Sequence, residues 1–579
     1  MIFFDFEVFQ YDWMVCYADT DASDKDCIVN DPDALRKFYE EHKREIWSGF
    51  NVNHYDQYIL KGILLGYDPK EINDWIIRDD QPGWMFSNKF NQVFLITYDI
   101  MLNNDRGLKV FEGFMGNNIK ETSVPFDIQR ELTPAEIEET KKYCFNDVEQ
   151  AMEVFIQRKG EFEARLDLVK LACENKRLDL TLLSKTKPQL SAIILGATKQ
   201  QHNDEFDIDF PDTLQLKKYA YVKDWYADER HHRYATHIEG RKTAVKMQLE
   251  TIIAGCPHVF AWGGVHGALE KYYGEGYYLM ADVASLYPSL MIRYNLHSRN
   301  MKDPQKYVDI YHERLRLKKA GDPLNKVLKL VLNSTYGVMK DKNNDLWDPR
   351  QANRVCIYGQ LLILDLIEHL EEAIPGFQLI QSNTDGILIR MQHKEDFWLI
   401  DDVCAEWEER TGLSLEFDEY RKVYQKDVNN YVIIGYDGHW KSKGAYVKDL
   451  SNLDYDLPVV NHALVDYMVK GTPVEDTIEG CNDLKEFQLV AKASSKYLYI
   501  LHGDEKLNES CIRVFASRRD SDQGVKKVSA RTKKPEKISN SPEHCFIFNE
   551  NVNGVQVPAY LDKKWYINMA KKRLKDFGI

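Results

Sequence analysis

The sequence predicts a multidomain α/β protein, and its length and two kinds of local pattern support this fold class. A chain of 579 residues is too long for a single hydrophobic core, so we expect two to four domains. The segments 2–9, 277–283 and 377–389 contain apolar runs typical of β-strands. The segments 136–155 and 326–341 repeat apolar residues at helical spacing instead.

The composition is that of a globular protein, with 44% hydrophobic and 12% aromatic residues. The net charge of −15 differs from that of a generic nucleic-acid-binding protein, which is usually basic. Positive charge gathers in the segments 524–537 and 561–577, the second with aromatic residues interleaved. Such runs are most often solvated faces, but they would suit phosphate contacts if they lay beside a catalytic unit.

The chain contains no run of about 18 apolar residues, so we expect no membrane-spanning helix. Its first residues, MIFFDFEVF, have no basic region and place two acids in the apolar run, unlike a signal peptide. The ten cysteines form no CxxC pair, which indicates reduced thiols and no structural zinc. We therefore expect a cytoplasmic protein, in the host cytoplasm if the source is viral, without a membrane partner.

Acidic residues recur in three segments of the first third. Asp5 and Glu7 are two apart on the strand expected at 2–9, so they share one face. A shared divalent metal would explain two carboxylates there, but a terminal edge strand with its acids in water is the alternative. In the second segment, Asn51 and Asp56 precede a helical apolar pattern.

The third acidic segment is a helix expected to begin at Thr133-Pro134, an N-cap and N1 pair. Tyr143 and Asp147 stand four apart on it and share a face. Taken together, the three segments offer several carboxylates and a tyrosine that could orient a water molecule. Two-metal hydrolysis of phosphodiesters requires such a set.

The ordered patterns Asp-x-Glu, Asn-x3-Tyr-Asp and Tyr-x3-Asp resemble the three motifs of proofreading 3′–5′ exonucleases with an RNase H-like fold. By this resemblance Tyr143 orients the attacking water and Asn51 contacts the single-stranded 3′ end. The resemblance implies these metal ligands: Asp5, Glu7, Asp56 and Asp147. The family often has a Ser-Leu pair and a lysine between its second and third motifs. This chain has Gly107-Leu108-Lys109, so the serine is missing.

A second group of motifs lies downstream. Asp282 follows an apolar strand, and the next residues, SLYPS, could fold so that backbone N–H groups cradle an anion. A strand-turn-helix with a capping serine is the plainer interpretation. A helix over 326–341 would place Lys329, Asn333 and Tyr336 on one face. On a preceding helix, Arg314 and Lys318 are also four apart.

The stretch QSNTDGILI, residues 381–389, reads as a hairpin whose turn carries Asn383, Asp385 and Gly386. DxxSLYPS, KxxxNSxYG and this TDG hairpin resemble motifs A, B and C of the family B DNA polymerases. With the exonuclease motifs, the resemblance spans about residues 1 to 390 and implies a right hand of palm, fingers and thumb. Asp282 and Asp385 would then bind two Mg²⁺ ions, with Val283 among the metal ligands.

The resemblance also assigns a nucleotide site. Ser285, Leu286 and Lys329 are expected to contact the phosphates, and Arg314 and Lys318 would add positive charge there. Tyr287 is expected to lie under the sugar. Asn333 and Tyr336 are expected to contact the base pair. By its place under the sugar, Tyr287 would select deoxynucleotides.

Three contacts with DNA depart from the family pattern. The segment HVFAWGGVHG resembles the YxGG segment, with Gly263 and Gly264 in place but Ala261 where the family has tyrosine. AKASSKYLYIL resembles the KxY strand only loosely, because Lys496 and Tyr497 are adjacent and would face opposite ways on a strand. Motif C usually reads Tyr-x-Asp-Thr-Asp-Ser, and here Asn383 stands near the expected primer end without the charge of the usual aspartate.

The spacing of the motifs indicates a compact member of the family. Asp282 and Lys329 are 47 positions apart, and Lys329 and Asp385 are 56 apart. These distances leave no room for the terminal-protein and strand-displacement insertions of protein-primed phage enzymes. The expected regions are an exonuclease domain (1–190), a linker with the first part of the palm (191–300), fingers (301–345), palm (346–455), and a thumb with a C-terminal DNA-binding region (456–579).

The expected activity is template-directed DNA synthesis with 3′–5′ proofreading, in phage DNA replication. The cofactors would be two Mg²⁺ per active site, with Mn²⁺ as a substitute. The partners would be primed template DNA, dNTPs and a single-stranded 3′ end, with helicase, primase and single-strand-binding protein as accessory factors. One rival is an exonuclease whose polymerase half has degenerated into a DNA-binding scaffold, and another is an RNA-directed or lesion-bypass polymerase.

Overall fold

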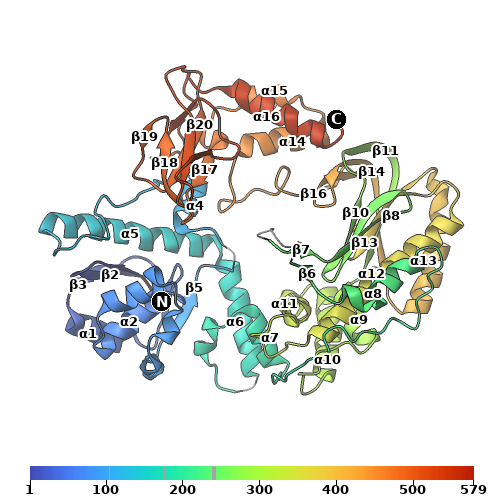
Figure 1. The fold of residues 1–579 in the computed structure, drawn as a ribbon, viewed down its shortest axis with the longest axis horizontal. Helices are drawn as coiled ribbons and strands as arrows, with labels where there is room; N and C mark the ends of the chain where they lie inside the picture. The colour runs from blue at the N-terminus through green and yellow to red at the C-terminus, as the bar shows by residue number, and fades with distance from the viewer. Residues whose placement is uncertain (104, 175, 238–242) are drawn as a thin grey trace. The chain divides into compact units, whose positions relative to one another are not determined.

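The computed structural model describes residues 1–103, 105–174, 176–237 and 243–579, and these residues form two compact units (Figure 1). Unit 1 comprises Met1–Thr186, Leu450–Val460 and Glu475–Met569. Unit 2 comprises Lys187–Asp449, Asn461–Val474 and Ala570–Ile579. Within the described ranges, none of the helices combines the length and the apolar character needed to cross a lipid bilayer.

The first part of unit 1 is built on a five-stranded sheet with the order β3-β2-β1-β4-β5. Its strands are β1 (Ile2–Val8), β2 (Trp13–Asp19), β3 (Lys25–Val29), β4 (Ile46–Gly49) and β5 (Ile96–Asp99). β1 pairs antiparallel with β2 and parallel with β4, so it lies inside the sheet. The strand predicted at the N-terminus is therefore confirmed, and the alternative of an exposed edge strand is excluded.

Apolar residues explain the central place of β1. Phe4 and Phe6 pack in one hydrophobic cluster with Trp47, and Phe3 packs in another with Val154 from the opposite face. The helices of this part are α1 (Pro32–His42), α2 (Asp56–Leu65), α3 (Pro69–Asn73), α4 (Leu108–Met115), α5 (Pro134–Gln157) and α6 (Lys159–Cys173). α5 lies along the sheet in Figure 1 and contacts β1 and β2.

The predicted start of α5 is confirmed. Thr133 is its N-cap and Pro134 its first helical residue. The Thr133 hydroxyl accepts a hydrogen bond from the backbone N–H of Glu136, whose carboxylate accepts one from the N–H of Thr133. This reciprocal capping box fixes where the helix begins and therefore where Tyr143 and Asp147 lie along it.

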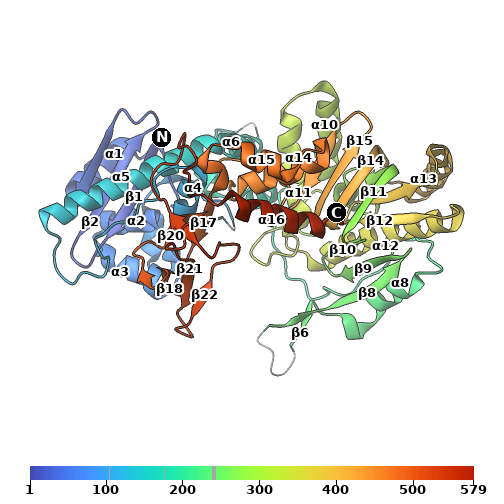
Figure 2. The same ribbon diagram turned by 90° about the horizontal axis from the view of Figure 1, so that it is seen from above.

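The late segment of unit 1 forms a three-stranded sheet, β17-β20-β23, and a four-stranded sheet, β19-β18-β21-β22 (Figure 2). Their strands are β17 (Leu489–Lys492), β18 (Tyr497–His502), β19 (Glu505–Lys506), β20 (Cys511–Ala516), β21 (Val525–Ser529), β22 (Pro535–Lys537) and β23 (Cys545–Ile547). The strand expected across AKASSKYLYIL is interrupted between β17 and β18. Lys496 accordingly lies in the turn before β18 rather than on a strand.

Side chains of this late segment satisfy the end of α4. Arg513, fully buried on β20, donates to the carbonyl oxygens of Gly113 (3.0 Å) and Asn117 (2.8 Å). Gln488 donates to the carbonyl of Phe114 (3.2 Å), and Lys485 donates to that of Met115 (2.9 Å). The last carbonyls of a helix have no partner within it, and cations favour that end. Residues of the late segment therefore supply the hydrogen-bond donors that the C-terminal end of α4 lacks within the helix.

Unit 2 is built on a nine-stranded sheet with the order β16-β15-β14-β11-β13-β12-β10-β9-β8. Its strands are β8 (Gln248–Ile253), β9 (Cys256–Ala261), β10 (Gly264–Ala268), β11 (Tyr272–Val283), β12 (Gln378–Ser382), β13 (Gly386–Met391), β14 (Leu415–Asp427), β15 (Asn430–Gly435) and β16 (Trp440–Lys443). A separate two-stranded sheet pairs β6 (Ala235–Thr236) with β7 (Val245–Lys246).

The helices of unit 2 are α7 (Lys187–Ile194), α8 (Ala220–Ala227), α9 (Leu286–Arg293), α10 (Gln305–Ala320), α11 (Leu324–Val338), α12 (Pro349–Ala373) and α13 (Phe397–Thr411). α12 is buried along most of its length and contacts α9, α13 and β10. α10 and α11 pack on each other. Three helices include residues of both units: α14 (Pro458–Lys470), α15 (Val474–Gly480) and α16 (Lys563–Asp576).

The helix predicted over 326–341 and the hairpin predicted around Asp385 are both confirmed, as α11 and as the antiparallel pair β12–β13. The division into an exonuclease domain, palm, fingers and thumb stays a proposal. The compact units cut across its last region, since Glu475–Met569 belong with the N-terminal residues.

Candidate functional site

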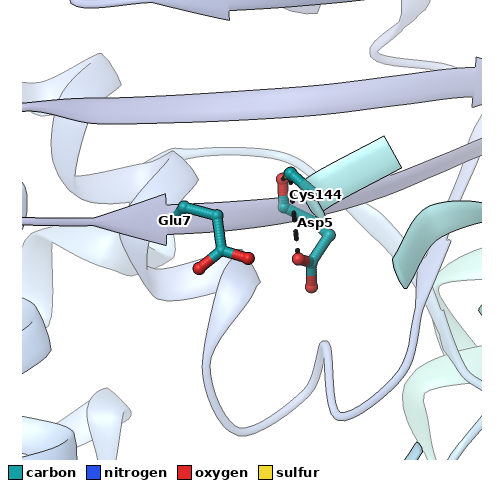
Figure 3. Close-up of side chains that lie close together, drawn as sticks. All are labelled: Asp5, Glu7 and Cys144. Atoms are coloured by element: carbon teal, nitrogen blue, oxygen red, sulfur yellow. Dashed lines mark hydrogen bonds between the residues drawn. The ribbon is translucent and has the colours of Figure 1, made fainter. Parts of the chain in front are cut away.

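Unit 1 gathers the acids of the first predicted motif on one side of β1. Figure 3 shows the carboxylates of Asp5 and Glu7 side by side, with Cys144 bonded to Asp5. One possible ligand atom from each of these three residues lies within 4.8 Å of the others. The Cys144 thiol donates to the backbone oxygen of Asp5 at 3.3 Å. The Asp5 and Glu7 carboxylates therefore stand close enough to share a cation.

Asp56 and Asp147 join this cluster from two helices. Asp56 is the first residue of α2, and its Oδ1 accepts a hydrogen bond from the N–H of Phe6 at 3.1 Å. Asp147 lies on α5, and its charge raises the pKa of both Asp5 and Glu7. The structure thus brings together all four carboxylates that the exonuclease motifs predict.

The electrostatics of the cluster are those of crowded, buried acids. Burial is the largest cause of the raised pKa values of Asp5 and Glu7, and neighbouring carboxylates add to it. Burial raises the pKa of Asp56 to about 7. Like charges held together in low dielectric favour the protonated form unless a cation compensates them. The donor set and its charge therefore fit hard divalent cations.

Tyr143 also lies close enough to these carboxylates to feel their charge. Burial, followed by the charges of Asp147 and Glu7, raises the pKa of its hydroxyl. The Nζ atom of Lys109 lies 4.5 Å from the centre of the Tyr143 ring. Asn51 is held differently, since its backbone N–H donates to Asp99 Oδ1 at 2.9 Å and its φ angle is 73°. Its role toward a 3′ end stays a prediction.

Two residues of this region were absent from the predicted site. Lys109, on α4, donates to Asp147 Oδ1 at 2.5 Å and to Glu112 Oε1 at 3.0 Å. The lysine of the family pattern was the available signal for Lys109. Glu112 lies three residues after Lys109 on the same helix, so the i,i+3 spacing of an acid and a lysine was the available signal.

In unit 2, the predicted acids Asp282 and Asp385 meet where β11 lies beside the β12–β13 hairpin. Asp282 is the cross-strand partner of Gly386, and the N–H of Val283 donates to the backbone oxygen of Asp385 at 2.7 Å. Burial, and then the charge of Asp385, raise the pKa of Asp282 to about 6. These two carboxylates also fit a divalent cation.

Glycine at position 386 permits this approach. A Cβ atom there would clash with Asp282 Oδ1 and would lie 2.8 Å from the backbone oxygen of Ala281. The Asp282 carboxylate therefore occupies the space that a side chain at position 386 would need. The serine that the family usually has at this place does not fit the observed arrangement.

Asn383 organises the turn of the hairpin. Its Oδ1 accepts from the N–H groups of Asp385 (3.1 Å) and Gly386 (2.8 Å), and its own N–H donates to the Gly386 oxygen (2.9 Å). This is an Asx-type turn, in which a short polar side chain replaces backbone partners.

Gln381 is 1% exposed, and neither polar atom of its side chain has a hydrogen-bond partner.

The predicted nucleotide residues lie on three helices of unit 2. Ser285 precedes α9 with a φ angle of 51°, and its hydroxyl accepts from Arg314 Nη1 of α10 at 2.9 Å. The rings of Tyr287 and Tyr336 stack at 3.9 Å, which joins α9 to α11. The other members are a buried Leu286 and the exposed Lys329 and Asn333 on α11.

Lys318 faces an acid that the sequence did not single out. Its Nζ lies 4.0 Å from Glu416 Oε1 on β14. Glu416 is the cross-strand partner of Asp282, and its charge adds to the raised pKa of that residue. The signal that could have found Glu416 is the alternating acidic pattern EFDE at residues 416–419.

The remaining predicted DNA contacts belong to different compact units. Gly263 is exposed at the turn before β10, and a Cβ on Gly264 would lie 3.6 Å from Thr384 Oγ1, next to the hairpin. Tyr497 belongs to unit 1, where its hydroxyl donates to Glu536 and Lys527 lies 4.2 Å from its ring centre. Contacts of these residues with DNA stay predictions.

Comparisons with known proteins show distant similarity to archaeal DNA polymerases. No protein-family model matches the chain. It is 25% identical over 199 residues to DNA polymerase 1 of Sulfurisphaera ohwakuensis, a match covering 34% of this chain and 22% of the relative. It is 24% identical over 284 residues to DNA polymerase 1 of Saccharolobus solfataricus, covering 41% and 31%. The matches thus span less than a third of either relative.

A solved structure, the family B DNA polymerase from Pyrobaculum calidifontis, aligns with 99% of this chain and 77% of its own. The TM-score is 0.40 and the sequence identity 15%.

Proposed function

We propose that the chain is a DNA-directed DNA polymerase of the family B type with a 3′–5′ proofreading exonuclease. The observation that carries the polymerase assignment is the meeting of Asp282 and Asp385, which are 103 positions apart in sequence, at one end of the unit 2 sheet. The sequence similarity to archaeal DNA polymerases supports the same reading.

The residues around this pair fit nucleotide addition. Asp282, Asp385 and the backbone of Val283 would hold divalent cations, which when bound lower the pKa of the attacking hydroxyl and neutralise the leaving pyrophosphate. Ser285 and Arg314 already form a hydrogen-bonded pair that could receive phosphate oxygens. The stacked rings of Tyr287 and Tyr336 would support the sugar and the base.

The sheet order of unit 1, with β1 between antiparallel β2 and parallel β4, supports an RNase H-like exonuclease. There Asp5, Glu7, Asp56 and Asp147 would hold the cations, and Tyr143 would orient the attacking water. We extend the proposal, as the sequence motifs suggest, to phage DNA replication with helicase, primase and single-strand-binding protein as accessory factors.

Primer extension tests the proposal directly. The purified chain should extend a primed DNA template with Mg²⁺ and dNTPs and should need no terminal protein, since the motif spacing leaves no room for the usual insertions. Strand displacement should be poor. Efficient unaided synthesis through a long duplex would contradict the inference about the insertions.

A degenerate polymerase with an intact exonuclease is the second candidate. Asn383 and Gly386 favour it, because both replace residues usual in the family. Digestion of a single strand without extension at any Mg²⁺ or Mn²⁺ concentration would establish it. The Asn383 turn and the fit of Asp282 over Gly386 support the active polymerase instead.

A further inference from the structure

Lys109 lies between two carboxylates in the interior of unit 1. Its Nζ is 2.5 Å from Asp147 Oδ1 and 3.0 Å from Glu112 Oε1. The side-chain exposures are 10% for Lys109, 12% for Asp147 and 0% for Glu112. A third neighbour is the Tyr143 ring, whose centre lies 4.5 Å from the Nζ atom. The ammonium thus has one partner in the acid cluster and one outside it.

Glu112 has an unused acceptor. Its Oε2 is buried and accepts no hydrogen bond of good geometry, although the backbone N–H of Lys120 lies near enough to lower the pKa of this carboxylate. An unpaired carboxylate oxygen in the interior is costly, so its retention calls for a physical reason. A lysine ammonium has three donors, and a shift of Lys109 toward Glu112 would place one of them on this oxygen.

A cation entering the acid cluster competes with Lys109. Asp147 is one of the four proposed metal ligands, and its Oδ1 is already bonded to the ammonium. A divalent cation bound to Asp147 through either carboxylate oxygen would stand close to the ammonium, and the two positive charges would repel each other. A lysine displaced into the interior with no anion nearby would oppose binding, whereas Glu112 offers it one.

We propose that Lys109 occupies the place of a divalent cation when the exonuclease site is empty, and that Glu112 is the positioning residue that receives the ammonium when a cation binds. The inference rests on the proposed exonuclease function, because it requires Asp147 to be a cation ligand. Glu112 touches neither DNA nor cation in this scheme and acts only through Lys109.

Mn²⁺ binding to the full-length chain, measured by electron paramagnetic resonance without DNA, tests the proposal. An Asp282→Asn, Asp385→Asn background leaves the unit 1 site to be measured alone. Glu112→Gln keeps the shape but removes the charge, and should raise the half-saturating Mn²⁺ concentration about tenfold. Glu112→Asp keeps the charge and should stay within about threefold.

Lys109→Met removes the competitor and should lower the half-saturating concentration. In that background, adding Glu112→Gln should have no further effect, because Glu112 acts through Lys109. A merely structural role of Glu112 would give additive losses instead. Unchanged Mn²⁺ affinity in Glu112→Gln, weaker affinity in Lys109→Met, or an undiminished Glu112→Gln effect without Lys109 would each overturn the proposal.

Failure of the proposed function would look different. Asp5→Asn with Glu7→Gln should abolish Mn²⁺ binding in the same background. If it did not, the acid cluster would not be the cation site, whatever the Glu112 variants showed. If it did, and the Glu112 variants behaved as the parent does, only the role of Glu112 would be wrong.

Discussion

The acid cluster of unit 1 and the acid pair of unit 2 both hold carboxylates close together, but different structural elements position them. In unit 1, four carboxylates come from a strand and two helices, and a buried lysine bonds one of them. In unit 2, two carboxylates come from a strand end and a hairpin turn, and Asp385 is exposed. Buried side chains organise the first site, whereas a turn made by the Asn383 side chain and the backbone organises the second.

This difference shows where each site is vulnerable. A site held by packed side chains should be sensitive to charge and to pH, because its carboxylates already repel one another. A site held by a turn should be sensitive to the backbone at positions such as Asn383 and Gly386. The predictions below test this contrast, from the largest expected effect to the smallest.

Removing either acid of unit 2 should abolish synthesis. Asp282→Ala or Asp385→Ala should reduce primer extension on the order of 10³-fold or more, because each is proposed to bind the reacting cations directly. Single-strand degradation should continue at the parental rate, which serves as the control for folding. Retained extension in both variants would rule out this pair as the polymerase centre.

The converse substitution should separate the two activities. Asp5→Ala with Glu7→Ala should abolish 3′–5′ degradation of a labelled single strand and leave extension of a matched primer largely intact. The reason is that the two acid groups belong to separate compact units. Degradation at the parental rate would show that the acids of β1 have no part in the hydrolysis.

Introducing the serine that is usual in family B polymerases should damage this chain. Gly386→Ser would push a Cβ atom into Asp282 Oδ1, with the Ala281 oxygen also too close, so extension should fall by about 10- to 100-fold. A neighbouring turn change, Thr384→Ser, serves as the matched control and should have little effect. Full activity of Gly386→Ser would mean that Asp282 reorients freely.

Acidic pH should stabilise the cation-free protein. The unfolded pKa of an aspartate is near 3.8, and the folded pKa of Asp56 is about 7, so the folded state binds more protons between these values. Stability is therefore lost as the pH rises through this window. In EDTA, Tm should be higher at pH 5 than at pH 8, and Asp56→Asn should flatten the difference. A Tm that rises toward pH 8 would contradict the raised pKa values.

The smallest effect concerns Asn383. Asn383→Asp keeps the oxygen that accepts from the N–H groups of Asp385 and Gly386, so extension should stay within about threefold. Asn383→Ala removes this acceptor and should lower Tm, at a cost of about 1 kcal/mol. An inactive Asn383→Asp alongside an active Asn383→Ala would show that charge, and not the turn, governs the position.

Local features of the fold could be predicted from the sequence. The apolar run around Asp5 predicted a strand, Thr133-Pro134 predicted the start of α5, and the residues around Asp385 predicted a hairpin. In each case the signal lies within about ten residues, where periodicity and capping determine the structure. The acids within these segments could therefore be placed on their elements in advance.

Partners distant in sequence could not be predicted. The pairing of Lys109 with Asp147 depends on the packing of α4 against α5, and the approach of Lys318 to Glu416 depends on how α10 lies relative to β14. Neither periodicity nor composition specifies such directions. For the same reason, the membership of Glu475–Met569 in unit 1 could not be predicted from the sequence of this strand-rich segment.

That membership has a consequence for the order in which the protein is made. The C-terminal end of α4 is completed by Lys485, Gln488 and Arg513, which leave the ribosome after the whole of Lys187–Asp449 has been synthesised. At about 5–20 residues per second, the first part of unit 1 waits roughly 15 to 60 seconds for them. In a chain released early, the helix that carries Lys109 would lack these hydrogen-bond donors at its C-terminal end. The acid cluster proposed as an exonuclease site should therefore gain this support only after the late segment of unit 1 has been synthesised.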